Sequence, residues 1–196
     1  MDASLKVLRD RQTGTAEFRR AAHTVCGQLM GDVRSRLQER GVGEHDVVIV
    51  IILRAGIAFL DAIADGFPNA PVGVLGLKRD EQKLEPHWYY ENLPPISMEH
   101  AVVIVDPMLA TGGSAEAAVE RLQKRGADSK RIYFVGVVAA PEGLSRLAAL
   151  IPRENIVLAT VDDGLDEHGV IVPGVGDFGD RFFGYSSRAI IGSRYD

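Results

Sequence analysis

The run of seven apolar residues at Val47–Leu53 (VVIVIIL) constrains the fold more than any other segment of the chain. All but the last are β-branched, and such residues favour strands. A strand that is apolar at every position is typical of a sheet buried on both faces, which in proteins is usually a parallel sheet. The run therefore predicts an α/β fold, with a mainly parallel central sheet flanked by helices.

The rest of the chain alternates in the way that this fold requires. Apolar residues recur at steps of three and four from Phe18 to Leu37, which predicts a helix over about 15–40. Strand-like runs and helical stretches then follow one another, as crossover connections between parallel strands demand. The further predicted strands span 72–77, 101–105, 132–138 and 156–161, and the further predicted helices span 57–64, 114–124 and 142–150.

Two segments break the alternation. Residues 79–95 are polar, aromatic and punctuated by proline, whereas residues 162–184 contain six glycines. Long irregular segments inside a compact domain are typically functional loops or lids. Ligands of open α/β sheets bind at the carboxyl ends of the strands, so we expect the site in the loops that leave these ends.

Composition narrows the classes of function. The chain has 196 residues, which predicts a single domain over 1–196, and its formal charge of -5 argues against nucleic-acid or membrane-surface partners. The longest apolar run is too short to span a bilayer, and the first ten residues lack the apolar core of a secretory signal. One cysteine, Cys26, suits a reducing compartment. We therefore expect a cytoplasmic protein.

The strand predicted at 101–105 leads into Asp106 and then Ala110-Thr111-Gly112-Gly113-Ser114, where a helix is expected to begin. Backbone N–H groups at a helix start, close-packed glycines and hydroxyl side chains together make an anion site. The loop contains no lysine, so it is not a Walker P-loop, and G-x-G-x-x-G is absent. Asp106 could accept hydrogen bonds from sugar hydroxyls. From these residues alone, a plain Asp–Pro turn that opens the helix is an equal alternative.

The whole string VDPMLATGGSA at 105–115 resembles the diphosphoribosyl-binding motif of type I phosphoribosyltransferases, in the variant of the uracil phosphoribosyltransferases. Other blocks resemble the same family in the same order. ILRAG at 52–56 is similar to its pyrophosphate loop, and residues 79–86 resemble its flexible hairpin. VAAPEG at 138–143 and the stretch 165–184 resemble its base-binding end. The resemblance implies the type I phosphoribosyltransferase fold, with a flexible loop at about 79–95 and a small C-terminal base-binding hood at about 162–184.

The resemblance also implies an activity. The chain would be a pentosyltransferase that moves ribose 5-phosphate from phosphoribosyl pyrophosphate (PRPP) to uracil, giving UMP and pyrophosphate in pyrimidine salvage. A related enzyme for another nucleobase or heterocycle, or a regulatory binder that senses nucleotides, would carry similar motifs. Mg²⁺ is expected, bound mainly through PRPP, and no His/Cys cluster points to a metal held by the protein itself. A homodimer or larger homo-oligomer is implied, and control by a nucleotide such as GTP stays open.

Carried over residue by residue, the resemblance assigns three sets of positions. The reaction centre would comprise Asp106, Arg54 and Asp177. PRPP would be bound by Arg54, Ala55, Gly56, Arg79, Asp106, Leu109, Ala110, Thr111, Gly112, Gly113 and Ser114. Uracil would be bound by Ile171, Gly176 and Asp177.

Chemistry supports two of these assignments independently. Arg54 ends a strand that is expected to be buried, and an unpaired guanidinium there would be costly. A diphosphate partner would neutralise its charge; the alternatives are a neighbouring carboxylate or a side chain that extends into solvent. The loop at 171–177 offers bare backbone, which can match the acceptor–donor–acceptor edge of uracil.

The chain departs from the family pattern in several places. Val170 stands where the family usually has tyrosine, and Ile51 where proline is frequent. Gln82 and Lys83 replace an acidic residue and a threonine of the flexible hairpin. Only the short stretch 41–46 joins the first long helix to the first strand, where relatives insert an arm that helps to build dimers. These departures concern base identity and oligomer geometry more than phosphate binding.

Overall fold

The computed structural model describes residues 1–79 and 86–185, and the side chains of residues 78, 79, 86 and 87 lie outside that description. Gln82 and Lys83 therefore fall outside the described residues, as does the side chain of Arg79.

A central sheet organises the described part of the chain. Its strands run in the order β3-β2-β1-β4-β6, and β5 and β7 also pair with β6. All pairs are parallel except β2 with β3. The strands are β1 (Val47–Leu53), β2 (Val72–Arg79), β3 (Pro86–Asn92), β4 (Ala101–Val105), β5 (Met108–Leu109), β6 (Ile132–Ala139) and β7 (Ile156–Val161).

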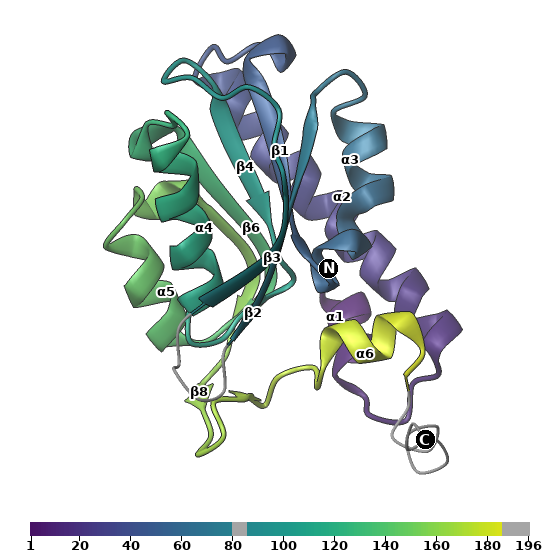
Figure 1. Ribbon diagram of the computed structural model, residues 1–196. Helices are drawn as coiled ribbons and strands as arrows, with labels where there is room; N and C mark the ends of the chain where they lie inside the picture. Colours follow the sequence, from purple (N-terminus) through teal and green to yellow (C-terminus); the bar gives the residue numbers. More distant parts are fainter. Residues whose placement is uncertain (80–85, 186–196) are drawn as a thin grey trace, which may run out of the picture.

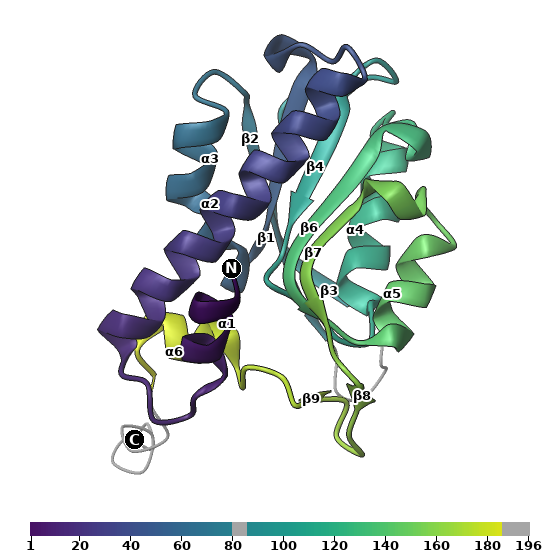
Figure 2. The ribbon, with the colours of Figure 1, turned by 180° about the vertical axis from the view of Figure 1, so that it is seen from behind.

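Helices cover both faces of the sheet (Figures 1 and 2). One face carries α1 (Asp2–Arg9), α2 (Thr15–Glu39), α3 (Leu60–Gly66) and α6 (Phe178–Phe183), and the other carries α4 (Gly113–Lys124) and α5 (Pro141–Ala148). Short 3-10 helices are η1 (Glu44–Asp46), η2 (Ala55–Phe59), η3 (Ser129–Arg131) and η4 (Arg153–Asn155).

The alternation of β1 explains why its sequence is apolar throughout. Val47, Ile49 and Ile51 belong to the core on the α2 side, whereas Val48, Val50 and Ile52 belong to the core on the α4 and α5 side. Burial of each such side chain stabilises the fold by roughly 1.5–3 kcal/mol. The expected parallel sheet between two helical layers is confirmed.

Several local predictions need correction. The helix expected at 57–64 begins as the 3-10 turn η2 and becomes α-helical only in α3. The segment 79–95 is not irregular throughout, because it contains β3, which pairs antiparallel with β2 and so agrees with the hairpin that the resemblance implies. The segment 162–184 contains the small hairpin β8 (Gly164–Leu165) and β9 (Ile171–Val172), as well as α6. Helix α1 was not predicted at all.

None of the helices in the described part of the chain combines the length and the apolar character that crossing a bilayer requires.

Candidate functional site

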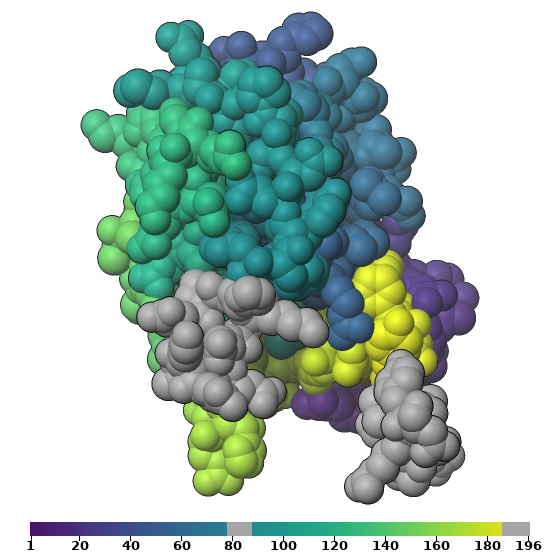
Figure 3. Space-filling view, in the orientation of Figure 1, coloured from purple at the N-terminus to yellow at the C-terminus, as the bar shows by residue number. Residues whose placement is uncertain are grey.

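The carboxyl ends of the parallel strands meet at the edge of the sheet where α6 and the β8–β9 hairpin lie (Figures 1 and 2). The loops that follow β1, β4 and β7 therefore lie near one another, and they begin with Arg54, Asp106 and Asp162. Figure 3 shows this end of the molecule, with the yellow surface of α6 next to the blue surface at the end of β1.

The loop after β1 packs tightly against β4. A Cβ atom on Gly56 would lie 2.7 Å from the carbonyl oxygen of Val105, so a side chain there would collide with backbone. Gly56 is buried, while Ala55 contacts α6, since its Cβ lies 3.6 Å from the position of a Cβ on Gly179. Because residue 56 has no side chain, the loop after β1 can lie directly against the end of β4, where the next loop begins.

Arg54 occupies a more open position than the sequence predicted. Its side chain is 55% exposed, and its Nη2 atom lies 2.9 Å from Oδ1 of Asp180 on α6. The guanidinium also faces the rings of Phe183 and Tyr185, at 5.9 and 5.5 Å from their centroids. Arg54 is therefore not a buried cation: solvent and a carboxylate, the alternatives to a diphosphate partner, stabilise its charge in the ligand-free protein.

The loop after β4 starts with a partly buried carboxyl. Burial raises the pKa of Asp106 to about 7, against the opposing effect of a hydrogen bond from the N–H of Met108 at 3.5 Å. Next along the chain, β5 pairs with β6, and the Leu109 side chain enters the core. The carbonyl of Leu109 accepts a hydrogen bond from the N–H of Ala140 at 2.9 Å. Because its side chain is buried, Leu109 can line a ligand site only with its backbone.

The turn at Gly112 and the start of α4, called the cradle below, are the segment that the sequence predicts as an anion site. Gly112 has φ +80°, a left-handed conformation that favours glycine, and the first helical hydrogen bond runs from the N–H of Glu116 to its carbonyl at 2.9 Å. The preceding N–H groups of Gly113, Ser114 and Ala115 have no acceptor within the helix. No side chain among the described residues caps this helix end. Thr111 precedes the turn, and the exposed Ser114 follows it.

A cation that the sequence did not point to lies beside this cradle. Arg146 on α5 pairs with Glu116, and its Nη1 atom lies 3.8 Å from the position of a Cβ on Gly113. The hydroxyl oxygen of Thr111 lies at the same distance from that position. A guanidinium and a hydroxyl therefore flank the amides at the helix start. Only the tertiary packing of α5 on α4 brings Arg146 there, so no local pattern could have revealed it.

The packing of α5 depends on a second glycine. A Cβ atom on Gly143 would collide with the carbonyl oxygen of Ala110, and one on Gly112 would lie 3.0 Å from the carbonyl oxygen of Gly143. The glycine in Pro141-Glu142-Gly143, at the start of α5, thus lets this helix pack directly against the loop that follows β5.

The loop after β7 is anchored by a buried carboxylate. Asp162 accepts two hydrogen bonds from the Arg9 guanidinium, at 2.7 and 2.6 Å, and one from the N–H of Gly174 at 2.8 Å. Burial alone would raise the pKa of Asp162, but the hydrogen bonds from Arg9 and Gly174 outweigh that effect and lower it. Between these anchors, Val172–Pro173 is a cis peptide bond, and Gly174 and Gly176 have φ of +60° and +76°.

The structure brings the three predicted base-contact residues into this one loop. The Ile171 side chain is buried in the core and Gly176 is buried as well, so both can offer only backbone groups. Oδ1 of the exposed Asp177 accepts a hydrogen bond from the N–H of Asp180 at 2.8 Å and so caps α6. Val170 is 42% exposed in the β8–β9 hairpin.

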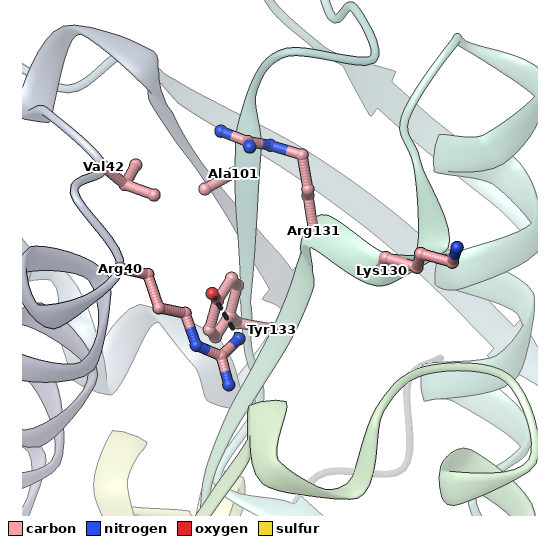
Figure 4. Close-up of a pocket in the computed structure, with 6 residues that line it drawn as sticks. All are labelled: Arg40, Val42, Ala101, Lys130, Arg131 and Tyr133. Atoms are coloured by element: carbon pink, nitrogen blue, oxygen red, sulfur yellow. Dashed lines mark hydrogen bonds between the residues drawn. The ribbon is translucent and has the colours of Figure 1, made fainter.

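A cavity of about 140 Å³ lies at the opposite end of the sheet, near the start of β4 and β6 (Figure 4). Three cations line it, but their charges do not converge on one point. Arg40 bonds the hydroxyl of Tyr133 at 2.9 Å, and Lys130 extends away from both Arg40 and Arg131. We therefore place the candidate site at the carboxyl ends of the strands.

Known proteins resemble the chain over most of its length. The uracil phosphoribosyltransferase family matches residues 33–185. The uracil phosphoribosyltransferase of Lacticaseibacillus paracasei is 41% identical over 194 residues, which cover 92% of each chain.

Solved structures agree. The AQ2163 protein from Aquifex aeolicus superposes with a TM-score of 0.82 at 34% identity, over 95% of each chain. A hypoxanthine phosphoribosyltransferase from Trypanosoma cruzi, at 13% identity over 75% of each chain, has a TM-score of 0.54 and shares the fold alone.

Replacing Asp106 by asparagine should stabilise the ligand-free protein at pH 8. The raised pKa means that the folded state holds the proton more tightly than the unfolded state. The carboxyl therefore supports the fold fully below about pH 4, and this support is lost as the pH rises toward 7. At pH 8 the variant should gain roughly 1–3 kcal/mol, because the carboxylate keeps part of its solvation.

Urea unfolding of both proteins at pH 4.5 and pH 8 measures this gain. We expect the difference between them to be small at the lower pH and largest at the higher one. A difference that does not change with pH would show that burial does not perturb Asp106.

Proposed function

Because the chain belongs to the uracil phosphoribosyltransferase family, it is a pentosyltransferase, and we propose that it makes UMP and pyrophosphate from uracil and PRPP. One observation carries this proposal beyond the family match. Three features lie at one edge of the sheet. They are the start of α4, whose N–H groups have no acceptor within the helix, the loop after β1 with Arg54 and Gly56, and the loop after β9, which offers backbone groups. These are the three surfaces that a phosphate, a diphosphate and a nucleobase need.

The 5-phosphate of PRPP would lie at the start of α4. The N–H groups of Gly113 and Ser114, the hydroxyl of Thr111 and the backbone of residues 109–112 would donate to its oxygens. Hydrogen bonds to charged oxygens contribute roughly 1.5–3 kcal/mol each, so a few of them suffice to hold the donor. Asp106, at the end of β4, would accept hydrogen bonds from the ribose hydroxyls.

The diphosphate would lie on the loop after β1. Arg54 would meet the negative charge that builds on the leaving group, and the amides of Ala55 and Gly56 would add donors beside it. Arg54 is paired with the Asp180 carboxylate in the ligand-free protein. When the donor binds, the guanidinium would have to leave Asp180 or bind Asp180 and the diphosphate together. Arg79, at the end of β2, is the second cation that we propose for the diphosphate.

Uracil would lie on the backbone of the loop that follows β9. Ile171 and Gly176 would present main-chain groups to its edge, and Asp177 would lie beside the reacting nitrogen. A site built from fixed N–H and C=O groups rejects a base with the opposite pattern of donors, such as cytosine, strongly. The left-handed conformations of Gly174 and Gly176 support a loop shaped for close approach.

We also propose that Mg²⁺ binds mainly through the diphosphate and ribose oxygens of PRPP, where it would neutralise negative charge. Asp106 fits a role next to such an ion. Its oxygen Oδ1 receives one long hydrogen bond, so lone pairs remain for hydroxyls or metal-bound water. We further propose that all residues from 1 to 196 act as one domain, within a homo-oligomer that works in the cytoplasm.

The function is tested by incubating the protein with PRPP, Mg²⁺ and a panel of bases. We expect UMP from uracil, and turnover of cytosine lower by roughly 10⁴-fold because of mismatched hydrogen bonds. Chromatography of the nucleotide and release of pyrophosphate are the measurements. Pyrophosphate release with a different base would favour a related transferase, and tight nucleotide binding without turnover would favour a regulatory binder.

Replacing Arg54 by alanine should raise KM for PRPP about 10- to 100-fold, since it removes charge-assisted hydrogen bonds to the diphosphate. KM for uracil should change little. Arg36→Ala is a matched control, because among the described residues Arg36 bonds only the carbonyl of Glu154, at 2.7 Å and far from the site. An unchanged KM for PRPP in Arg54→Ala would remove Arg54 from the donor site.

Replacing Arg146 by glutamine should raise KM for PRPP about three- to tenfold, because a charge beside the phosphate is lost while a polar side chain remains. Glu116→Gln breaks the same ion pair but leaves the guanidinium in place. It should therefore leave KM for PRPP unchanged or lower it. Equal increases in both variants would mean that the ion pair matters only for packing α5 on α4.

A further inference from the structure

Helix α1 lies outside the segment 33–185 that the family matches, yet it packs beside α6 (Figures 1 and 2). It also lies beside residues 171–177, where the proposed base contacts are, and we call this segment the base-side loop. The helix is only eight residues long, and Asp2, Ala3 and Lys6 are exposed. Two leucines, Leu5 and Leu8, anchor it to the core. The polar contacts at its end are what distinguish it.

Arg9, the last residue of α1, makes hydrogen bonds that hold the base-side loop in place. Both of its terminal nitrogens bond the Asp162 carboxylate, whose side chain is 2% exposed. Nη1 of Arg9 also bonds the carbonyl of Gly174 at 3.2 Å, and Asp162 accepts from the N–H of the same glycine. The pair therefore fixes both backbone groups of Gly174, midway between the proposed base contacts Ile171 and Gly176.

A second arginine, on α6, also connects the base-side loop to the end of α1. Arg181 on α6 donates to the carbonyl of Val175 at 2.7 Å, to that of Asp10 at 2.6 Å and to that of Leu8. Its guanidinium lies 4.3 Å from the centre of the Phe18 ring, which holds it in place. Residues 174 and 175 are thus tied to the end of α1 by two independent guanidinium groups.

Such ties matter because the loop has little stiffness of its own. Gly174 and Gly176 have no side chains to pack, and glycine loses the most conformational freedom when it is ordered. A backbone that recognises a base must be held to within a fraction of an ångström, since small displacements cost large factors in rate or affinity.

We propose that Arg9 is a positioning residue of the nucleobase site, and that α1 acts through the Arg9–Asp162 pair to hold the loop that selects the base. The proposal rests on the proposed function. The donor site depends on it far less, because the loops after β1 and β4 make no hydrogen bond with Arg9 among the described residues.

The test compares Arg9→Ala and Arg9→Lys with the wild-type protein in steady-state kinetics, varying uracil and PRPP separately. We expect KM for uracil to rise at least about tenfold in Arg9→Ala, with KM for PRPP within about twofold of wild type. Lysine can place one N–H on Asp162 but cannot bind it with two, so Arg9→Lys should restore part of the affinity for uracil.

Arg40→Ala serves as the matched control. Arg40 also makes two side-chain hydrogen bonds, to Tyr133 and to Asn155 at 2.6 Å, but at the opposite end of the sheet (Figure 4). It should lower the melting temperature without changing KM for uracil. This separates a general loss of stability from a displaced base loop.

An unchanged KM for uracil in Arg9→Ala would overturn the proposal, as would a parallel increase in both KM values. If Arg9→Ala does not fold, Arg9→Lys decides by the same criteria. Wild-type protein that makes no UMP would overturn the proposed function before any variant is compared. In that case KM for whichever base releases pyrophosphate replaces KM for uracil, and the role of Arg9 is still tested.

Discussion

The burial of β1 on both faces is the constraint on which the rest of the structure depends. Because its side chains fill two cores, helices must cover both faces of the sheet, and the neighbouring strands run parallel to it. Parallel strands end at one edge, so the loops that carry Arg54 and Asp106 begin side by side, and the loop that carries Asp162 begins at the same edge beyond β6. The contact between Gly56 and the end of β4 shows how closely the cores hold these loops together.

The sequence predicted the parts of this arrangement that depend on neighbours along the chain. Strands β1, β4 and β7 have the predicted bounds. β1 and β4 are continuous apolar runs that are buried almost throughout, whereas β7 contains Thr160 and is only partly buried. The turn at Gly112 was predicted because helix starts and glycines have a local signature. Local signals are weaker in the two-residue strands β8 and β9, whose hairpin is held by contacts such as the Asp166 turn.

What the sequence could not reveal is which distant residues meet. Arg9 and Asp162 are 153 positions apart, and Arg54 and Asp180 are 126 apart, so neither pair leaves a spacing that can be read from the chain. The same limit explains one correction. Arg54 was expected to be buried because it follows a buried strand, whereas its side chain leaves the sheet toward α6. Leu109 was expected to contribute its backbone amide to the phosphate site, and the pairing of β5 with β6 buries only its side chain, so that expectation stays a prediction.

Electrostatics pose the last problem, since a chain of net charge -5 must receive a donor that carries several negative charges. The proposed site would meet this charge locally, because Arg54 follows β1, Arg146 lies beside the start of α4, and that helix start adds a partial positive charge. Asp106 is the acid that would oppose binding, but burial keeps its pKa near 7, so much of it is uncharged at neutral pH until a ligand stabilises the carboxylate. The carboxylate can then form where ribose hydroxyls or a cation stabilise it. The same burial that raises the free energy of the carboxylate thus makes its ionisation sensitive to a ligand that lies beside it.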